Sequence, residues 1–391
     1  MKFKEYLMED ALDAIIDYRG KTPQKSDTGI PTLSAKSVKN NHINYAECYY
    51  ISEAEYKRFM VRGFPQKGDI LLTTEAPMGM VAKLDRDDVA IAQRLLTLRG
   101  KDGVLDNNYL LYLLQSPYGQ GLLKERETGT TVTGIKQAEF RKIIVNLPDI
   151  TIQKKIGSIL SAIDQKITCN TKINDNLFEM VNAYYTSLFK DIECEMTTIG
   201  NYAERIYSGG TPTTSNATYW DGAFGWFSSG ETRNRFVIST EKTITQAGID
   251  NSSTKLAAKH DIVMASAGQG FTRGQISMLL LDTYVNQSVI VIHADRRVLP
   301  YLFWNLANRY EELRAISDSS SIRGSLTTKM IASFEIPLAN EDSLQRFADF
   351  SWSVIPQIES NLLENECLAA LRNTLLPKLM SGEIDVSDIQ L

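Results

Sequence analysis

Apolar residues recur at alternating steps of three and four positions in two long segments of the chain, and this spacing predicts two amphipathic helices. In the first segment they are Ile152, Ile156, Ile159, Ile163, Ile167, Ile173, Leu177, Met180, Tyr184 and Leu188. In the second segment they are Leu344, Phe347, Val354, Ile358, Leu368, Leu371, Leu375 and Leu379. The pattern is typical of a coiled-coil seam, and each helix would be about 55 Å long at ~1.5 Å per residue. We expect Pro356 to kink the second helix or to divide it in two.

The rest of the chain mixes short apolar runs with Gly, Pro, Ser and Thr, which indicates small elements joined by turns. The short runs at 70–72 and 289–292 predict buried strands, and the longer runs at 110–114 and 301–306 predict helices. This mixture favours an α/β (α+β) globule of about 150 residues in each half. The boundaries define four expected parts: a globule at 1–149, a helical region at 150–195, a second globule at 196–340 and a second helical region at 341–391.

The second half of the chain repeats the first at a nearly constant offset. YRGKTP at 18–23 returns as YSGGTP at 207–212, and GDIL at 68–71 returns as HDIV at 260–263. Weaker matches follow in the same order: 76–79 with 267–270, 92–93 with 286–287, 131–134 with 321–324, and the LP at 147–148 with the IP at 336–337. Matches in one order at one offset indicate an internal duplication.

Asparagines interrupt both predicted seams at corresponding places. Asn170 and Asn174 lie in the first seam, and Asn361 and Asn365 lie 191 positions later in the second. One interpretation is that two solvated turns were duplicated with the rest of the chain. The other is that the four amides lie near the crossing of two antiparallel helices, where a seam asparagine fixes register.

The net charge of −5 is concentrated at one end, because residues 341–391 carry nine acidic and three basic side chains. This charge argues against a protein that coats nucleic acid without selectivity, but not against a specific reader. The four cysteines and three histidines lack the spacing of a metal site. No apolar run approaches the roughly 20 residues that span a bilayer, and no signal segment opens the chain, so we expect a cytoplasmic protein with no membrane partner.

The two globules have diverged where polar loops are expected. AKSVK at 35–39 in the first copy stands where the second has SSGET at 228–232. Dimeric DNA-binding proteins present two identical readers to a palindromic site. Two similar but unequal readers on a duplicated frame therefore predict an asymmetric target in two parts with an unread spacer.

The chain resembles a type I restriction–modification specificity subunit over essentially its whole length. The motifs that carry the resemblance are G-x-T-P at 20–23 and 209–212, [GH]-D-[IV] at 68–70 and 260–262, I/L-P followed by Gln153 or Gln345, and LLPKLMSGEI at 375–384. The last motif is the most specific. His260 departs from the usual Gly of the G-D motif, and Pro77-Met78 replaces the Gly268-Gln269 of the other copy.

The resemblance implies two target recognition domains related by a pseudo-two-fold axis and separated by two long helices that form an antiparallel coiled coil. It implies double-stranded DNA as the ligand, two methyltransferase (modification) subunits as partners, and restriction/translocase subunits in the complete complex. We expect no cofactor, no metal and no catalytic residue in this chain; S-adenosylmethionine, ATP and Mg would belong to the partner subunits. No P-loop lysine motif is present, and none of the eleven prolines is followed by another, as the loop of an amino-methyltransferase would require.

Sequence reading requires side chains that donate or accept hydrogen bonds at base edges, with phosphate contacts that set position. The candidates are polar residues in glycine-containing loops, although each alone is also typical of a solvated turn. In the first domain they are Lys21, Thr22, Lys36, Lys39, Thr74, Gln93, Arg94, Thr133 and Lys136. In the second domain they are Thr211, Ser228, Ser229, Thr232, Arg233, Asn234, Arg235, Gln269, Thr272, Arg273, Gln287 and Arg323. The segment 232–235 is the richest, because Arg pairs with guanine and Asn with adenine.

Two other classes of function stay open. A fused nuclease or methyltransferase is opposed by the missing motifs. An assembly scaffold that reads no DNA would explain the helices, but it would not explain why the copies differ most in polar loops. If the helices set the spacer, four extra residues in each should add about 6 Å, or roughly two base pairs at ~3.4 Å each.

Overall fold

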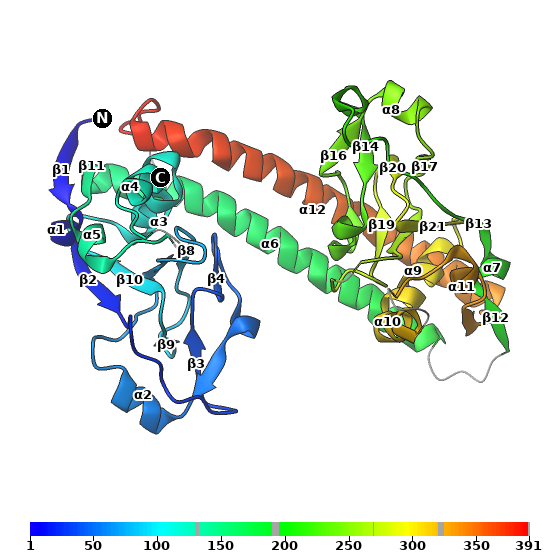
Figure 1. Cartoon of the computed structure of the whole chain (residues 1–391), viewed down its shortest axis with the longest axis horizontal. Coiled ribbons are helices and arrows are strands. Elements are labelled where there is room, and N and C mark those ends of the chain that lie inside the picture. Colours follow the sequence, from blue (N-terminus) through cyan, green and yellow to red (C-terminus); the bar gives the residue numbers. More distant parts are fainter. Residues whose placement is uncertain (130–132, 190–194, 269, 320–323, 390–391) are drawn as a thin grey trace. The chain divides into compact units, whose positions relative to one another are not determined.

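The computed structural model describes residues 1–129, 133–189, 195–268, 270–319 and 324–389 (Figure 1). The chain forms two compact units. Unit 1 comprises residues 1–167 and 367–391, and unit 2 comprises residues 168–366. Each unit thus combines one globule with part of each long helix.

Unit 1 is a mixed α/β globule. Its elements are β1 (Phe3–Leu7), α1 (Met8–Ala11), β2 (Leu12–Asp17), β3 (Ile30–Leu33), β4 (Val38–Lys39), β5 (His42–Ile43), η1 (Tyr45–Glu47), β6 (Tyr49–Ile51), α2 (Glu53–Phe59), β7 (Ile70–Thr73), β8 (Val81–Lys83), β9 (Ala90–Ile91), β10 (Leu95–Gly100), α3 (Asn107–Gln115), α4 (Pro117–Glu125), α5 (Gln137–Arg141) and β11 (Ile144–Pro148). The central sheet has the order β2-β10-β7-β8 with antiparallel neighbours. The strand expected at 70–72 is β7, and the helix expected at 110–114 is α3.

Unit 2 repeats this plan. Its elements are β12 (Met196–Thr198), α7 (Ile199–Tyr202), β13 (Ala203–Ser208), η2 (Ala217–Tyr219), β14 (Trp220–Phe227), η3 (Ser229–Arg233), β15 (Phe236–Val237), β16 (Lys242–Ile244), α8 (Gln246–Asp250), β17 (Lys255–Ala257), β18 (Ile262–Ala265), β19 (Ile276–Leu279), β20 (Thr283–Val285), β21 (Val289–Ala294), α9 (Leu299–Ala307), α10 (Tyr310–Ser319), α11 (Thr328–Ala332) and β22 (Glu335–Pro337). The expected strand at 289–292 is β21, and the expected helix at 301–306 is α9.

The duplication extends to strand pairing. The order β13-β21-β18-β19 matches the central sheet of unit 1, and the pair β12-β22 matches β1-β11. β3 pairs antiparallel with β6 and parallel with β9, and β14 pairs in the same senses with β16 and β20. Such correspondence of antiparallel and parallel partners identifies the two units as copies of one fold.

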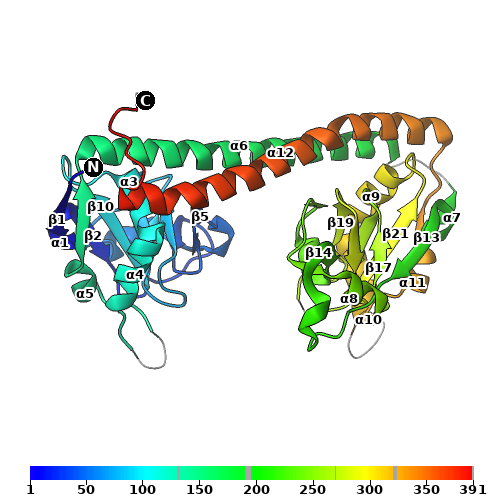
Figure 2. The ribbon, with the colours of Figure 1, turned by 90° about the horizontal axis from the view of Figure 1, so that it is seen from above.

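Two long helices, α6 (Ile150–Phe189) and α12 (Glu341–Ser381), contribute to both units, and within each unit a segment of α6 contacts a segment of α12. In unit 2, Asn170 contacts Asn365, whereas Asn174 contacts Asn361. In the same unit, α9 lies between the sheet and these helices (Figure 2). The antiparallel pairing expected from the seams is therefore present.

The α12 helix is continuous through Pro356, so of the two outcomes expected at that proline, a kink or a division, the division is wrong. Val354, Ile355 and Ile358 on both sides of it are buried, while Pro356 itself is exposed. Packing on either side holds the helix together, and water can reach the carbonyl that the proline leaves without its N–H donor. The seams also differ in detail, because Ile173, Met180 and Leu371 are exposed.

Candidate nucleic-acid interface

In unit 1 the candidate loops converge at one edge of the central sheet. Because neighbouring strands are antiparallel, β2 and β7 end at the edge where β8 and β10 begin. Gln93 Nε2 donates a 2.5 Å hydrogen bond to Thr22 Oγ1, and Ile135 N donates one of 2.9 Å to Thr74 O. We call residues 18–22, 74–79, 92–94 and 133–135 the loop edge of unit 1.

Basic side chains surround one carboxylate at this edge. Arg94 lies 2.8 Å from Glu75, and Arg19 lies 3.7 Å from it. Lys21, two residues after Arg19 in the chain, is exposed. Arg94 has a φ of 69°, a left-handed conformation that costs a non-glycine residue free energy and often marks a functional loop. The loop edge therefore presents positively charged side chains, and one of them, Arg94, is held in a backbone conformation that non-glycine residues disfavour.

The remaining candidates of unit 1 divide by burial. Lys36 lies in the loop after β3, next to the loop edge, because Ala92 N donates to Leu33 O at 2.8 Å. Its side chain is exposed, as are those of Lys39, Thr133 and Lys136. Thr74 is buried, and its backbone bonds to the two neighbouring loops. Of these residues, Thr74 supports the edge and the others are open to solvent.

Unit 2 forms the same edge from the corresponding loops. Thr211 donates a hydrogen bond to the Gln287 side chain, as Gln93 does to Thr22 in unit 1. Ser266 N donates to Ser288 O at 2.9 Å, and Leu326 N donates to Ser266 O at 2.8 Å. We call residues 209–213, 266–268, 270–275, 286–288 and 324–326 the loop edge of unit 2. Gln269 and Arg323 lie outside the described residues.

The segment 228–235 follows β14 and lies beside the loop edge, since Asn286 N donates to Phe227 O. Ser228 and Glu231 form a capping box that begins η3, and Ser229 is half-buried in it. Thr232 is buried. Arg233 is exposed and pairs with Glu241. This local structure explains why four polar residues in a row do not share one environment.

Asn234 and Arg235 are exposed, but they differ in what they face. Arg235 lies 3.6 Å from Asp175 of α6, and its guanidinium stands 4.2 Å from the centroid of the Phe178 ring. Arg235 therefore contacts the long helix. The backbone carbonyl of Asn234 accepts a hydrogen bond from Ser277, which leaves the amide side chain at the surface.

The base of the loop 270–274 is held by a buried ion pair to α10. Arg273 is buried and pairs with Asp318, and half-buried Thr272 starts a tight turn in which Gln275 N donates to Thr272 O at 2.8 Å. Phe271, at the tip, is 86% exposed. Sequence reasoning placed weight on the polar residues of this loop and missed Phe271, although a single aromatic inside a run of Gly, Thr and Arg was a visible signal.

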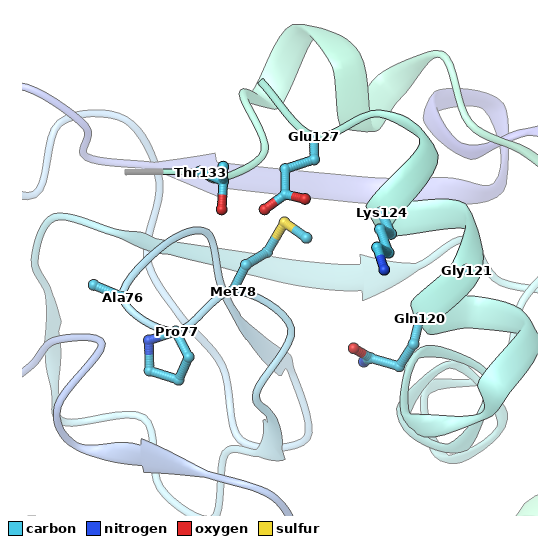
Figure 3. Close-up of a pocket in the computed structure, with 8 residues that line it drawn as sticks. All are labelled: Ala76, Pro77, Met78, Gln120, Gly121, Lys124, Glu127 and Thr133. Carbon is cyan, nitrogen blue, oxygen red and sulfur yellow. The ribbon is translucent and has the colours of Figure 1, made fainter. Parts of the chain in front are cut away.

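A cavity of about 620 Å³ opens between the loop edge of unit 1 and α4 (Figure 3). The side chains of Met78, Lys124 and Glu127 project into it. Gln120 Nε2 holds the loop by donating to Gly79 O at 2.9 Å. In unit 2 the corresponding helix, α10, also bonds to the loop, which is longer there, through the side chains of Tyr310 and Arg314. The two edges therefore differ in shape as well as in side chains.

Asp69 and Asp261, the aspartates of the [GH]-D-[IV] motif, have different partners in the two units. Arg99 donates two 2.8 Å bonds to buried Asp69, and these bonds raise the pKa of Arg99. In unit 2, His293 Nδ1 lies 2.5 Å from Asp261 Oδ1. Burial raises the pKa of Asp261, and the contact with His293 opposes that shift. The duplicated position thus keeps a buried carboxylate while its partner changes.

His260, which replaces the usual glycine, has a φ of 78°. Its ring contacts Trp352 of α12 with centroids 4.7 Å apart. Burial lowers the pKa of His260, and Lys259 and Arg296 add to that shift. The aromatic contact offsets part of the cost of the left-handed backbone.

The four asparagines of the seams form one cluster in unit 2. Asn170 Nδ2 donates to Asn365 Oδ1 at 3.0 Å and to Glu364 at 2.7 Å. Asn361 Nδ2 donates to Asn174 Oδ1 at 2.7 Å, and Asn174 Nδ2 donates to the Ile358 carbonyl at 3.2 Å. Each pair thus joins a residue of one copy to the non-equivalent residue of the other. This arrangement supports the hypothesis that the amides fix register.

Within the part of the chain that the structure describes, no group of three or more His, Cys, Asp or Glu side chains is arranged to hold a metal ion. The described helices include none that is both long and apolar enough to cross a membrane.

The comparisons with known proteins agree with this architecture. Residues 14–178 match the model of the type I restriction modification DNA specificity domain. The MjaIX specificity subunit of Methanocaldococcus jannaschii is 22% identical, over 92% of this chain and 88% of that protein. The HindI specificity subunit of Haemophilus influenzae is 20% identical, over 82% of this chain and 87% of that protein.

The fold is also found in a solved structure. The S subunit of a type I restriction–modification system from M. genitalium superposes with a TM-score of 0.64 at 16% identity, covering 97% of this chain and 96% of that one. The sequence motifs, the duplicated recognition fold and these matches agree with one another. The chain is similar over most of its length to type I restriction enzyme specificity subunits, and residues 14–178 match the type I restriction modification DNA specificity domain.

Proposed function

We propose that this chain reads an asymmetric DNA target in two parts, one with each loop edge, and positions modification and restriction subunits on that DNA. The observation that carries the proposal is the loop edge itself. The same loops meet at the same edge of the sheet in both units, yet the exposed side chains differ. Two half-sites of different sequence require the same loop arrangement with different exposed side chains, and the two units have this combination.

The exposed side chains suit contact with DNA. In unit 1, Arg94 offers a guanidinium for guanine, and Lys21 and Lys36 offer charges for phosphates. In unit 2, Arg233 and Asn234 offer the groups that pair with guanine and adenine. Arg233 would have to leave or share its ion pair with Glu241, which is cheap at an exposed site.

The chemistry belongs to partners in this proposal. Two methyltransferase subunits would flip and methylate adenines with S-adenosylmethionine, and restriction/translocase subunits would use ATP and Mg. This chain would contribute recognition and position, without a catalytic residue. The long helices α6 and α12 offer exposed faces to such partners.

Co-expression with the neighbouring methyltransferase, followed by sequencing of methylated adenines on genomic DNA, tests the proposal. One asymmetric motif with two short parts and a fixed gap is expected. Arg233→Ala should relax base preference in one part only, since a lost bidentate contact costs about 1–3 kcal/mol of discrimination. Arg235→Ala is the matched control, because Arg235 contacts α6, and it should leave the motif unchanged. A stable complex without any motif would favour the scaffold that reads no DNA.

A further inference from the structure

The loop edge of unit 2 carries a side chain that base-edge hydrogen bonding cannot use. Phe271 is 86% exposed, and the next most exposed large apolar side chain among the described residues, Val61, is 65% exposed. An aromatic ring left in water forgoes the burial that stabilises aromatic residues elsewhere in the fold. The Phe271 ring is therefore accessible to a ligand at the loop edge of unit 2.

The backbone under the ring is fixed at several points. Tyr310 Oη donates to Phe271 O at 2.6 Å, and Arg314 donates to Gly270 O at 2.7 Å. Gly274 has a φ of 83° and closes the turn by donating to Ala265 O at 2.9 Å. Bonds before and after the ring thus present it on a preorganised loop, which lowers the entropy cost of binding.

The base of the loop is fixed as well. Arg273 pairs with Asp318 and donates to Gly324 O at 3.3 Å, with only 5% of Arg273 exposed. This buried cation ties the loop to α10 and to the neighbouring loop. Because a buried guanidinium is costly unless it is paired, these contacts hold the base of the loop in one position.

The surroundings of Phe271 indicate the kind of ligand. Apart from Phe271, the described residues of the loop edge of unit 2 include one large apolar residue, Leu326, and it is buried; the others are Gly, Ala, Ser, Thr, Pro, Asn, Gln and Arg. The buried core of a protein interface is more apolar than its rim, and no second exposed large apolar side chain stands beside Phe271 among the described residues of this edge. A single ring among small polar residues suits the flat face of a nucleic-acid base, which stacks on aromatic side chains, or the gap between two base pairs, into which apolar side chains insert.

We propose that Phe271 contacts DNA bases by stacking or by insertion at a base step in the half-site that unit 2 reads. The inference rests on the proposed function and adds a contact that depends on shape and deformability. Specificity from Phe271 would favour base steps that unstack easily, such as TA and CA/TG. It would therefore extend to base pairs whose edges no side chain reads.

The test uses the full complex with its methyltransferase and the motif obtained from the wild-type chain. Phe271→Ala should weaken binding to that DNA roughly 5- to 100-fold, as loss of one aromatic–base contact does, while Phe271→Trp should retain most of the binding. The melting temperature of the Ala variant should equal that of the wild type, because the ring is exposed. Met196→Ala, which removes another exposed apolar side chain of unit 2, should bind as the wild type does.

DNA duplexes with 2-aminopurine at successive positions locate the contact. Binding of the wild type should raise the fluorescence at one base step of the half-site read by unit 2, and Phe271→Ala should abolish that rise. Unchanged affinity and fluorescence in the Ala variant would overturn the inference while leaving the proposed function standing. A variant that loses the methyltransferase but not DNA would also overturn it, in favour of protein docking. A wild-type complex without any motif would overturn both.

Discussion

Asp164 of α6 fixes the globule of unit 1 to both long helices, and its replacement by alanine is a sharp test of how that unit is held together. Arg372 of α12 donates a 2.7 Å bond to Asp164 Oδ1. Tyr112 of α3 and Asn41, at the turn between β4 and β5, donate bonds of 2.7 and 3.0 Å to Oδ2. One carboxylate therefore joins four elements.

The magnitude follows from burial and charge. The side chains of Asp164 and Arg372 are 18% and 23% exposed, so solvent screens the pair only in part. Each hydrogen bond to a charged group contributes about 1.5–3 kcal/mol, and water replaces some of that when the carboxylate is removed. We expect Asp164→Ala to lower the free energy of unfolding of unit 1 by about 3 kcal/mol. For a domain of this size that corresponds to a fall of about 6–12 °C in Tm.

Calorimetry of the full chain measures this effect, with the transition of each unit followed separately because two units need not unfold together. Asp175→Ala is the matched control on the same helix. Asp175 and Arg235 are 66% and 52% exposed and 3.6 Å apart, so their pair should contribute about 0–1 kcal/mol. Both variants gain the same helix propensity from alanine. If the two variants lowered Tm equally, the reasoning from burial would be refuted.

Three further predictions concern unit 2. His260→Gly should be more stable than His260→Ala by about 1 kcal/mol in urea unfolding, because both lose the ring contact but only alanine keeps the left-handed cost at φ 78°; equal stabilities would contradict this. Burial lowers the pKa of His260 from 6.5, so below that pH the unfolded chain binds a proton that the folded chain resists. The wild type should therefore lose stability as pH falls through this range, and His260→Gly should lose less; parallel pH profiles would count against it. Replacing both Asn361 and Asn365 by Leu removes bonds to the facing helix and should change the register or the oligomeric state. Light scattering measures the oligomeric state and distances between spin labels on the two helices measure the register; one unchanged species with unchanged distances would rule out a register role.

The sequence predicted the long-range plan better than the environment of single residues. The seams of α6 and α12 and the short runs that became β7 and β21 were visible because periodic apolar positions report directly on a buried face. Because the chain is duplicated, the same apolar pattern predicted the same elements in both halves.

Burial within loops was not visible in the sequence. Arg273 and Arg233 both stand in polar, glycine-containing stretches, yet Arg273 is buried against Asp318 and Arg233 is exposed. The partner of Arg273 lies 45 residues away in the chain, so the residues around Arg273 do not predict this ion pair. Phe271 illustrates the converse, because an aromatic residue in sequence is expected in a core and this one stands in solvent.

The division of the two units along the chain has a consequence for the order of folding during synthesis. Unit 2 is one continuous stretch, residues 168–366, whereas unit 1 needs residues 367–391 to be complete. Leu376, Leu379, Met380 and Val386 are buried in the core of unit 1. A nascent chain therefore leaves apolar surface of its first globule uncovered until residues 367–391 have been made, while the later globule can already close. Premature termination after α12 has begun should yield a chaperone-bound or aggregated product, even though most of the recognition fold has been made.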